Sequence, residues 1–187
     1  ELSEKKKSLF NRYIEIFCAK NSHTNLMSKN DEKLIFEKHI FDSLALNLFF
    51  TKNQLETKDK ILLDIGTGGG FPLLPLGIVF DKMKLTGLDS TSKKVKIINE
   101  ITHELGLKNV KTVDSRAENF QKEKGKYYDF ITARAVGTLD LILKYALPLL
   151  NKNGYFIAYK SKLVQDEIKK SKNILKAHRA KVLDIIE

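Results

Sequence analysis

The sequence contains little cysteine and histidine. Among its 187 residues there is one cysteine, Cys18, so an internal disulfide is excluded. The four histidines do not have the spacing of a recognisable metal site, and there is no Cys/His cluster. We therefore expect no metal cofactor. The histidines are His23, His39, His103 and His178.

Long apolar runs are also missing. No run approaches the roughly 20 residues that a membrane-spanning helix needs. The opening residues ELSEKKKSLF lack the apolar stretch of a signal peptide. We therefore expect no membrane span and a cytoplasmic location. Hydrophobic residues still make up 42% of the chain, which is enough for the core of one domain with an appended element.

Acidic residues are in the minority. The chain has 33 lysines and arginines against 23 aspartates and glutamates, which gives a net charge of +10. Such a charge favours encounter with phosphate-rich partners, and RNA is the first candidate. A lysine-rich surface also serves solubility alone, so clustering has to distinguish the two. Lysines gather at residues 5–7, 93–96 and 169–181.

The first 58 residues have helical rather than strand-like periodicity. The polar turn NSHTNLMSKND divides them into two helices. We expect the second to run from about Glu32 to Phe50, with Ser28, Asn30 or Asp31 as its N-cap. The pattern predicts a helical cap over residues 1–58. Apolar residues at helical spacing are Leu9, Tyr13, Ile16, Phe17, Ile35, Ile40 and Leu44.

From residue 59 to 187, apolar strands alternate with helical segments. This alternation predicts an α/β fold with a mostly parallel, doubly wound sheet that binds ligands at the carboxyl ends of its strands. The expected order is strand ILLDI, a helix after Pro72, strand KLTGLD, a helix from Ser92 to near Gly106, strands VKTVD and YYDFITARA, a helix from Thr138 to Leu150, a turn over Asn151 to Gly154, strand YFIAYK, a lysine-rich helix and the apolar stretch KVLDII.

The segment Ile61 to Pro72, ILLDIGTGGGFP, is the most informative. An apolar strand leads there into a glycine-rich turn and a helix start. Gly66, Gly68 and Gly70 let the backbone adopt positive φ and pass close beneath a ligand. The dinucleotide fingerprint requires a third glycine five residues after the first, where this chain has Phe71. The spacing therefore excludes an NAD site.

Two carboxylates accompany this turn. Asp64 precedes it, and Asp89 ends the next apolar strand. The pairing resembles the S-adenosyl-L-methionine motif of Rossmann-like class I methyltransferases, because carboxylates suit a sulfonium, an ammonium and a ribose diol. The alternative is that the glycines form a tight turn and that Asp89 only caps the next helix.

The residues after the predicted fourth strand restrict the methyl acceptor. An Asn/Asp-Pro-Pro-aromatic segment, usual in enzymes that methylate exocyclic amines, is replaced by Ala133 to Val136. Methylation at carbon 5 of a pyrimidine needs a cysteine nucleophile, and Cys18 lies far away in the sequence. An acceptor that is already nucleophilic remains, such as ring nitrogen 7 of guanine. It needs positioning and no general base, so we assign no catalytic residue.

Several further segments resemble one family, the bacterial small-subunit (16S) ribosomal RNA guanine-N7 methyltransferase G, also called glucose-inhibited division protein B. They are NLMSKND, KHIFDSL, LLDIGTGGGFPLLPL, LDSTSKKVKII, SRAENF, FITARAVGTL and NGYFIAYKS. The resemblance implies S-adenosyl-L-methionine as cofactor and ribosomal RNA or a ribosomal particle as partner. The cofactor-binding positions that it implies, with Gly68 and Asp89 added from the loop argument, are Gly66, Gly68, Phe71, Asp89, Ala117, Glu118 and Arg134.

For some of these residues a structural role is the alternative. Glu118 would otherwise be an exposed loop acid. Arg134 suits a cofactor carboxylate or an RNA phosphate, or else an ion pair with Asp64 or Asp129. Three cap residues share a helical face, so we expect them to act together at the mouth of the cleft. The alternative is that they only tie the cap to the sheet. They are His39, Asp42 and Ser43. Asn25 and Lys160 are further candidate RNA contacts.

Two other functions stay open at this point. A small-molecule methyltransferase would share the glycine loop, and a non-catalytic RNA-binding module would keep only the fold. Methyltransferases of this class usually finish with an antiparallel hairpin, whereas this chain stops within the expected first arm. We therefore expect the C-terminal hairpin to be incomplete.

Overall fold

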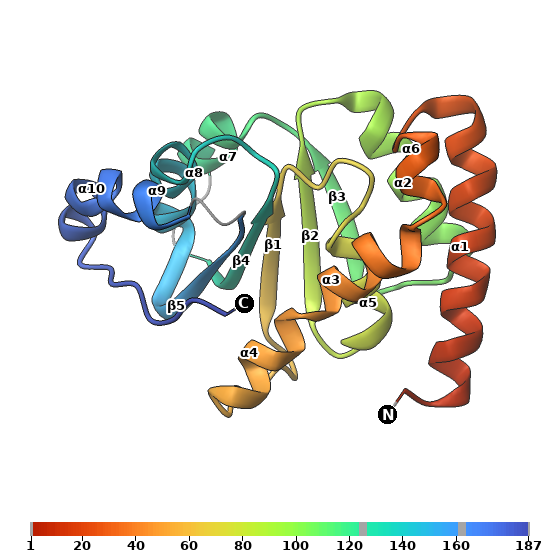
Figure 1. Cartoon of the computed structure of the whole chain (residues 1–187), viewed down its shortest axis with the longest axis horizontal. Coiled ribbons are helices and arrows are strands. Elements are labelled where there is room, and N and C mark those ends of the chain that lie inside the picture. Colours follow the sequence, from red (N-terminus) through yellow and green to blue (C-terminus); the bar gives the residue numbers. More distant parts are fainter. Residues whose placement is uncertain (1, 124–126, 161–163, 187) are drawn as a thin grey trace.

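The computed structural model describes residues 2–123, 127–160 and 164–186. Five parallel strands form one sheet in the order β3-β2-β1-β4-β5 (Figure 1), which confirms the predicted doubly wound α/β fold. The strand order reverses next to β1, which is where ligands bind in such sheets. The strands are β1 (Ile61–Ile65), β2 (Lys84–Asp89), β3 (Val110–Asp114), β4 (Tyr128–Arg134) and β5 (Leu150–Tyr159).

Helices cover both faces of the sheet (Figure 1). Neighbouring residues of β1 point to opposite faces, so Leu62 and Leu63 belong to different cores. The Leu62 core holds helices α1 (Glu4–Thr24), α5 (Leu73–Val79) and α6 (Ser92–Glu104). The Leu63 core holds α7 (Ala117–Glu123), α8 (Leu139–Ala146) and the 3₁₀ turn η2 (Leu147–Leu149).

Helix α1 begins the cap. Ser3 accepts a hydrogen bond from the Lys6 amide at its start, and Asn25 ends it in the left-handed conformation with φ of 53°. Its buried aromatic side chains recur at helical spacing and belong to the same core as α5. The cap therefore packs against α5 and α6 in this core, and a domain boundary at residue 58 stays a prediction. The buried residues are Phe10, Tyr13, Phe17 and Asn21.

The single helix predicted from Glu32 to Phe50 is wrong. Leu34 has φ of −115° and ψ of 24°, which interrupts the helical backbone, and a π-helix follows. Ser28 is the N-cap, as expected, and accepts a hydrogen bond from the Asp31 amide at 3.1 Å. The elements are α2 (Lys29–Glu32), the π-helix η1 (Ile35–Phe41), α3 (Asp42–Leu44) and α4 (Leu46–Lys52).

The C-terminal third also differs from the prediction. The turn over Asn151 to Gly154 lies inside β5 as a register shift, because Tyr128 pairs with Leu150 and Phe130 with Tyr155. The lysine-rich segment forms α9 (Val164–Lys170) and α10 (Lys172–Ala177).

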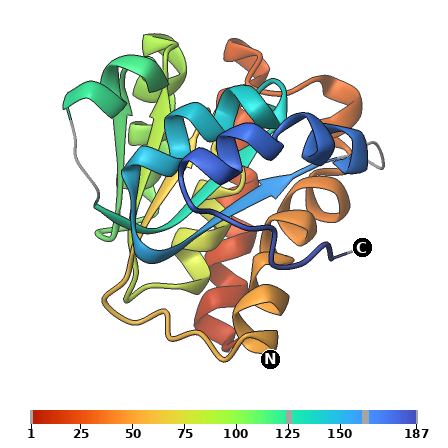
Figure 2. The same ribbon diagram turned by 90° about the vertical axis from the view of Figure 1, so that its left-hand side faces the viewer.

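The segment KVLDII forms no strand. Figure 2 shows it as an extended tail. Asp184 anchors this tail, since its carboxylate lies 2.5 Å from Lys52 Nζ of α4. Within the described ranges, none of the helices has the length and apolar character needed to cross a membrane.

Candidate functional site

One cavity of about 700 Å³ lies at the carboxyl ends of the central strands, between the cap and α8. Its volume suits a ligand of nucleoside size. The structure brings all seven predicted cofactor residues to its wall, although they come from four separate parts of the chain. They are Gly66, Gly68, Phe71, Asp89, Ala117, Glu118 and Arg134.

The glycine loop is fixed from below by β2. The amides of Gly66 and Thr67 donate to the Leu88 carbonyl at 2.7 and 3.0 Å. Two of the glycines that line the cavity, Gly66 and Gly68, differ in what surrounds them. A Cβ on Gly66, whose φ is +70°, would lie 2.4 Å from a methyl carbon of Val136. A Cβ on Gly68, whose φ is +54°, would meet only the Gly66 carbonyl oxygen among described atoms, at 3.7 Å. Gly68 therefore borders open space.

Asp89 joins this loop to the next helix. One carboxylate oxygen accepts from the Gly68 amide at 2.8 Å, and the other accepts from the Thr91 amide at 2.9 Å. Thr91 is the N-cap residue of α6. The alternative role expected for Asp89, capping of the next helix, therefore accounts for only one of the two contacts that Asp89 makes. A carboxylate has about four acceptor positions. Asp89 can therefore accept further hydrogen bonds from a ligand hydroxyl in the cavity.

Asp64 lies behind the loop and does not line the cavity. Its side chain is fully buried, and Thr132 Oγ1 donates to one carboxylate oxygen at 2.8 Å. The other oxygen has no partner among the described residues. Burial raises the pKa of Asp64 to about 7. This carboxylate therefore supports the loop from within the core, and the expectation that it meets a cationic group of the cofactor is not supported.

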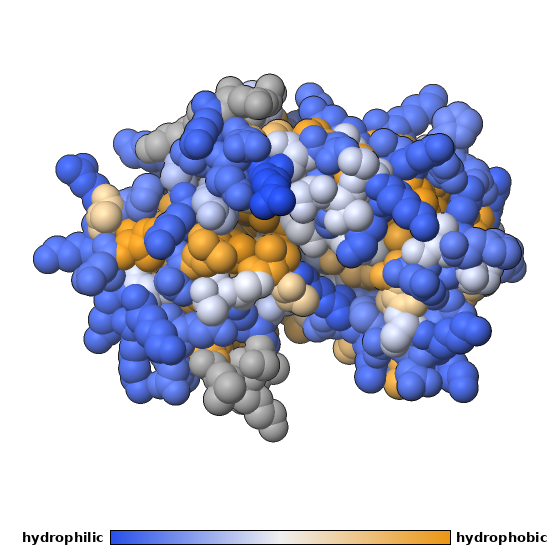
Figure 3. All heavy atoms as spheres, turned by 90° about the horizontal axis from the view of Figure 1, so that it is seen from above, coloured by the Kyte–Doolittle hydropathy of each residue, from blue (hydrophilic) through white to orange (hydrophobic). Residues whose placement is uncertain are grey.

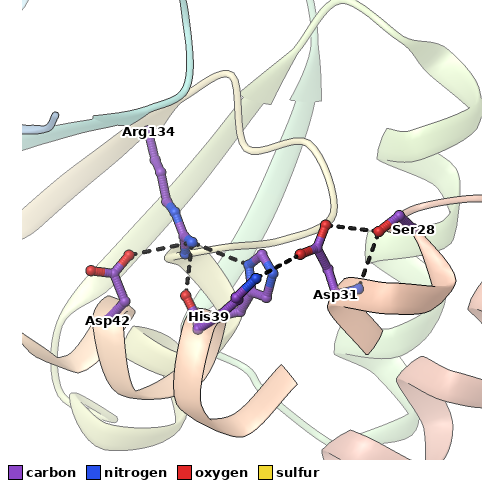
Figure 4. Close-up of polar contacts among 6 residues, drawn as sticks. Ser28, Asp31, His39, Asp42 and Arg134 are labelled. Carbon is purple, nitrogen blue, oxygen red and sulfur yellow. Dashed lines mark hydrogen bonds and ion pairs between the residues drawn. The ribbon is translucent and has the colours of Figure 1, made fainter. Parts of the chain in front are cut away.

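Arg134 leaves the end of β4 and reaches across to the cap (Figure 4). Its Nη2 lies 2.9 Å from the Lys38 carbonyl, 3.1 Å from His39 Nδ1 and 3.3 Å from an Asp42 oxygen. The expected alternative partners, Asp64 and Asp129, are wrong, because the guanidinium points away from the sheet. Its Nη1 has no partner in the described part of the chain. Arg134 thus retains a free donor beside the cavity.

Asp129 lies at the other end of β4. It accepts from the Ile61 amide at 2.9 Å and lies 3.9 Å from Lys60 Nζ. The interpretation that cap residues tie the cap to the sheet holds for His39 and Asp42, which both contact Arg134.

The cavity has two walls that sequence reasoning missed. The first is apolar and comes from α8 and the loop before it; its exposed residue Leu141 is 40% accessible. Viewed from above, Figure 3 shows an apolar area over this part of the molecule. The sequence contained an indication of this wall, because an apolar helix directly follows the predicted fourth strand. These residues are Val136, Leu141, Ile142 and Tyr145.

The second missed wall comes from the cap and consists of Leu26, Met27, Ser28 and Asp31. The sequence indication of this wall was the segment NLMSKND, which resembles the family. From this segment, only Asn25 was proposed as a contact, and that contact was with RNA. Asn25 is the C-cap residue of α1 and does not line the cavity, and its expected contact with RNA stays a prediction. Figure 4 shows Asp31 on α2 and Ser28 at the N-cap of this helix, and their side chains are joined by a hydrogen bond of 2.8 Å.

Lys160 supports the loop that follows Arg134. Its Nζ donates to the Gly137 carbonyl at 2.7 Å and lies 2.7 Å from Glu167 Oε2. The same Glu167 oxygen accepts from the Leu139 amide at 2.6 Å. Lys160 therefore holds the cavity wall from outside, and its expected contact with RNA stays a prediction.

The cavity fits S-adenosyl-L-methionine by three observations. It has a glycine edge open to the ligand, a carboxylate with spare acceptor positions, and an unpartnered guanidinium nitrogen for the methionine carboxylate. Cys18 on α1 does not line it. Among the described residues, His, Cys, Asp and Glu form no group of three or more that is placed to hold a metal ion.

Solved structures share this fold at low sequence identity. A SAM-dependent methyltransferase from Aquifex aeolicus has a TM-score of 0.53 and 22% identity, over 73% of this chain and 81% of its own. The YcgJ protein from Bacillus subtilis has a TM-score of 0.56 and 19% identity, over 71% of this chain and 66% of its own.

Sequence relatives are closer. Ribosomal RNA small subunit methyltransferase G of Fusobacterium nucleatum is 43% identical over 172 residues, which cover 92% of this chain and 72% of the relative. The Staphylococcus aureus protein of that name is 38% identical over 175 residues, covering 92% and 71%. The family model described as rRNA small subunit methyltransferase G matches residues 6–187. The chain therefore belongs to the rRNA small subunit methyltransferase G (GidB) family.

Proposed function

We propose that this protein transfers a methyl group from S-adenosyl-L-methionine to ring nitrogen 7 of one guanine in 16S ribosomal RNA. Membership of the family supports the reaction and the RNA substrate. The observation that carries the proposal to this chain is the convergence of all seven predicted cofactor residues on one cavity. The two alternatives, a small-molecule methyltransferase and a non-catalytic module, have no comparable support.

We assign each cavity wall a part in holding the cofactor. Gly66 and Gly68 would allow close approach of the ligand, and Asp89 would accept from the ribose hydroxyls. The Ala117-Glu118 pair would flank the adenine opposite the apolar α8 wall. Arg134 would bind the methionine carboxylate through its free Nη1. When bound, the cofactor supplies an electrophilic methyl group on a cationic sulfur.

The protein's contribution to the reaction is positioning. Guanine nitrogen 7 carries an in-plane lone pair, so no side chain has to remove a proton before transfer. The walls instead exclude water and orient the two reactants, which reduces the entropic barrier. This role is consistent with a cavity whose charged side chains are already held by protein contacts, as Asp89 and Arg134 are.

The RNA-binding surface is expected near α9 and α10. These helices pack against α8, which forms one cavity wall. Lys169, Lys170 and Lys172 on them are exposed. Figure 3 shows hydrophilic side chains around the apolar area near α8. Positive charge at this position would hold phosphates beside the cavity mouth.

Reversing the charge of Lys169, Lys170 and Lys172 together to glutamate should weaken binding of small-subunit RNA by roughly tenfold or more and reduce its salt dependence. Cofactor affinity should not change, because none of the three lines the cavity. Filter binding across a salt series measures the first effect and calorimetry the second.

Lys58, Lys82 and Lys84 offer a matched control. They are exposed and lie near the amino ends of β1 and β2, opposite the cavity. Their reversal makes the same change in net charge. Equal loss of RNA affinity in both triple variants would mean that net charge alone, and no particular face, attracts the RNA.

The reaction itself is tested with small ribosomal subunits that lack the modification. They are incubated with the protein and labelled S-adenosyl-L-methionine, and the methylated nucleoside is identified by mass spectrometry. We expect a single 7-methylguanosine and a rate that falls steeply with added salt. Cofactor binding without transfer to RNA, together with a salt-independent rate on a small acceptor, would favour the small-molecule alternative.

A further inference from the structure

His39 lies where the cap meets the cavity. It belongs to the π-helix η1, and it lines the cavity together with Phe71 and Arg134. Its side chain contacts both of these residues. Nδ1 lies 3.1 Å from Arg134 Nη2, and the imidazole ring lies 5.1 Å from the Phe71 ring between centroids, at an angle of 48°. Figure 4 shows the ring pointing toward the guanidinium.

The contact with Arg134 determines the proton position on the imidazole. Guanidinium nitrogens only donate, so Nδ1 has to accept and the ring has to be neutral with its proton on Nε2. His39 Nε2 is shielded from solvent and has no partner among the described residues. A protonated ring would place two donors and two positive charges against each other.

The surroundings favour this neutral ring. Burial lowers the pKa of His39 most, and the Arg134 cation lowers it further. Asp31 and Asp42 raise the pKa, whereas Lys38 lowers it. These are the charged groups that face the ring from β4, α2, α3 and η1 itself. The net result is a pKa below the ordinary value, so His39 is neutral near neutral pH.

Contacts within the cap and from the sheet also fix the backbone around His39. Ser43 Oγ donates to the His39 carbonyl at 2.5 Å, and Tyr159 Oη at the end of β5 donates to the Ser43 carbonyl at 2.9 Å. Arg134 donates to the Lys38 carbonyl at 2.9 Å. The imidazole therefore has a defined position relative to both β4 and β5.

We infer that His39 is a positioning residue for the cofactor: its neutral ring orients Arg134 through Nδ1 and holds Phe71 by ring packing. This inference rests on the proposed function, because Arg134 and Phe71 matter here as residues that contact the cofactor. One cap residue then sets two sides of the cavity.

Two variants separate the two contacts. His39→Phe keeps an aromatic ring against Phe71 but has no acceptor, and His39→Asn places an acceptor near the position of Nδ1 but has no ring. Calorimetric titration with S-adenosylhomocysteine at about pH 8 should give a roughly tenfold weaker affinity for His39→Phe. His39→Asn should recover most of that loss. His178→Phe is the control, because His178 is exposed and outside the cavity.

The pH profile gives a readout that a merely structural role would not change. Wild-type affinity should fall as the pH is lowered from about 8 to about 5.5, because protonation of the ring removes the acceptor for Arg134. Both His39 variants should lose this part of the dependence. With saturating cofactor, the rate of RNA methylation should fall by a smaller factor than the cofactor affinity does, and thermal unfolding should show that both variants are folded.

Two results would overturn the inference. The first is His39→Phe binding S-adenosylhomocysteine as tightly as the wild type with an unchanged pH profile. The second is unchanged affinity in both variants with a slower methylation rate, which would make His39 a substrate contact. If the wild type binds cofactor but does not methylate RNA, only the proposed acceptor is contradicted, since the affinities still decide the role of His39.

Discussion

Replacing Gly68 with leucine is expected to abolish cofactor binding, with an affinity loss of roughly 100-fold or more. Gly68 lines the cavity, and a Cβ there meets only the Gly66 carbonyl oxygen among described atoms. The new side chain would therefore occupy space intended for the ligand without a clash inside the protein. Leucine is preferred to valine because β-branched residues tolerate positive φ poorly. Calorimetric titration with S-adenosyl-L-methionine measures the effect.

The control for this substitution is Gly106→Leu. Gly106 has φ of +67°, close to the +54° of Gly68, and no described atom lies within 4 Å of its added Cβ. Each variant should lose about 1–2 kcal/mol of stability through left-handed strain, so equal melting temperatures are expected. Only Gly68→Leu should lose the cofactor. Normal affinity in that variant would mean that the ligand does not approach the loop at this point.

Gly66 is a less informative position for the same experiment. A Cβ there would lie 2.4 Å from Val136, so a larger residue would displace the loop after Arg134 as well as the ligand. Loss of binding would then have two explanations. Gly68 distinguishes these two explanations, because a side chain added there enters open space.

The second large effect concerns the buried carboxylate of Asp64. Its folded-state pKa of about 7 lies above the ordinary value of 3.8, so the folded protein binds this proton more tightly than the unfolded chain. The free energy of unfolding should therefore fall as the pH rises from about 4 to about 7, by an amount on the order of 4 kcal/mol from this group. Above pH 7 the contribution becomes constant.

Asp64→Asn should remove this pH dependence, because the amide does not titrate. Urea unfolding between about pH 4 and pH 8.5 should show a variant that gains on the wild type as the pH rises. Thr132→Val is the companion variant: it deletes the hydroxyl that lowers the Asp64 pKa, so the decline should extend to higher pH. Parallel stability curves for wild type and Asp64→Asn would contradict a raised pKa in the folded state.

The periodicity of the sequence was sufficient to predict the sheet, because parallel strands buried on both faces are continuous apolar runs. The glycine loop and the carboxylate of Asp89 were recognisable for a similar reason, since their chemistry is local. What failed was geometry that depends on distant neighbours. The apolar residues around Leu34 keep a helical spacing in the sequence, but the backbone leaves the helical conformation at Leu34. Residues Asn151 to Gly154 have the composition of a turn, but they lie within β5.

The partners of Arg134 illustrate the same limit. The expected alternatives were Asp129 on the same strand and Asp64 on the neighbouring strand β1, but the guanidinium contacts Lys38, His39 and Asp42 in the cap. No pattern in the sequence reports that direction, because it depends on how η1 packs over the end of β4. The roles assigned to the seven predicted cofactor residues stay predictions, which measurements of cofactor affinity test.

The order of the strands has a consequence during synthesis. Strand β1 pairs with β2 and with β4, so its second neighbour emerges more than 60 residues after it. A nascent chain that has reached α6 already contains the cap and the glycine loop. It still lacks Arg134 and the apolar wall of α8. The cavity is therefore a late product of folding, and a growing chain gains no stabilisation from the cofactor until its sheet is nearly complete.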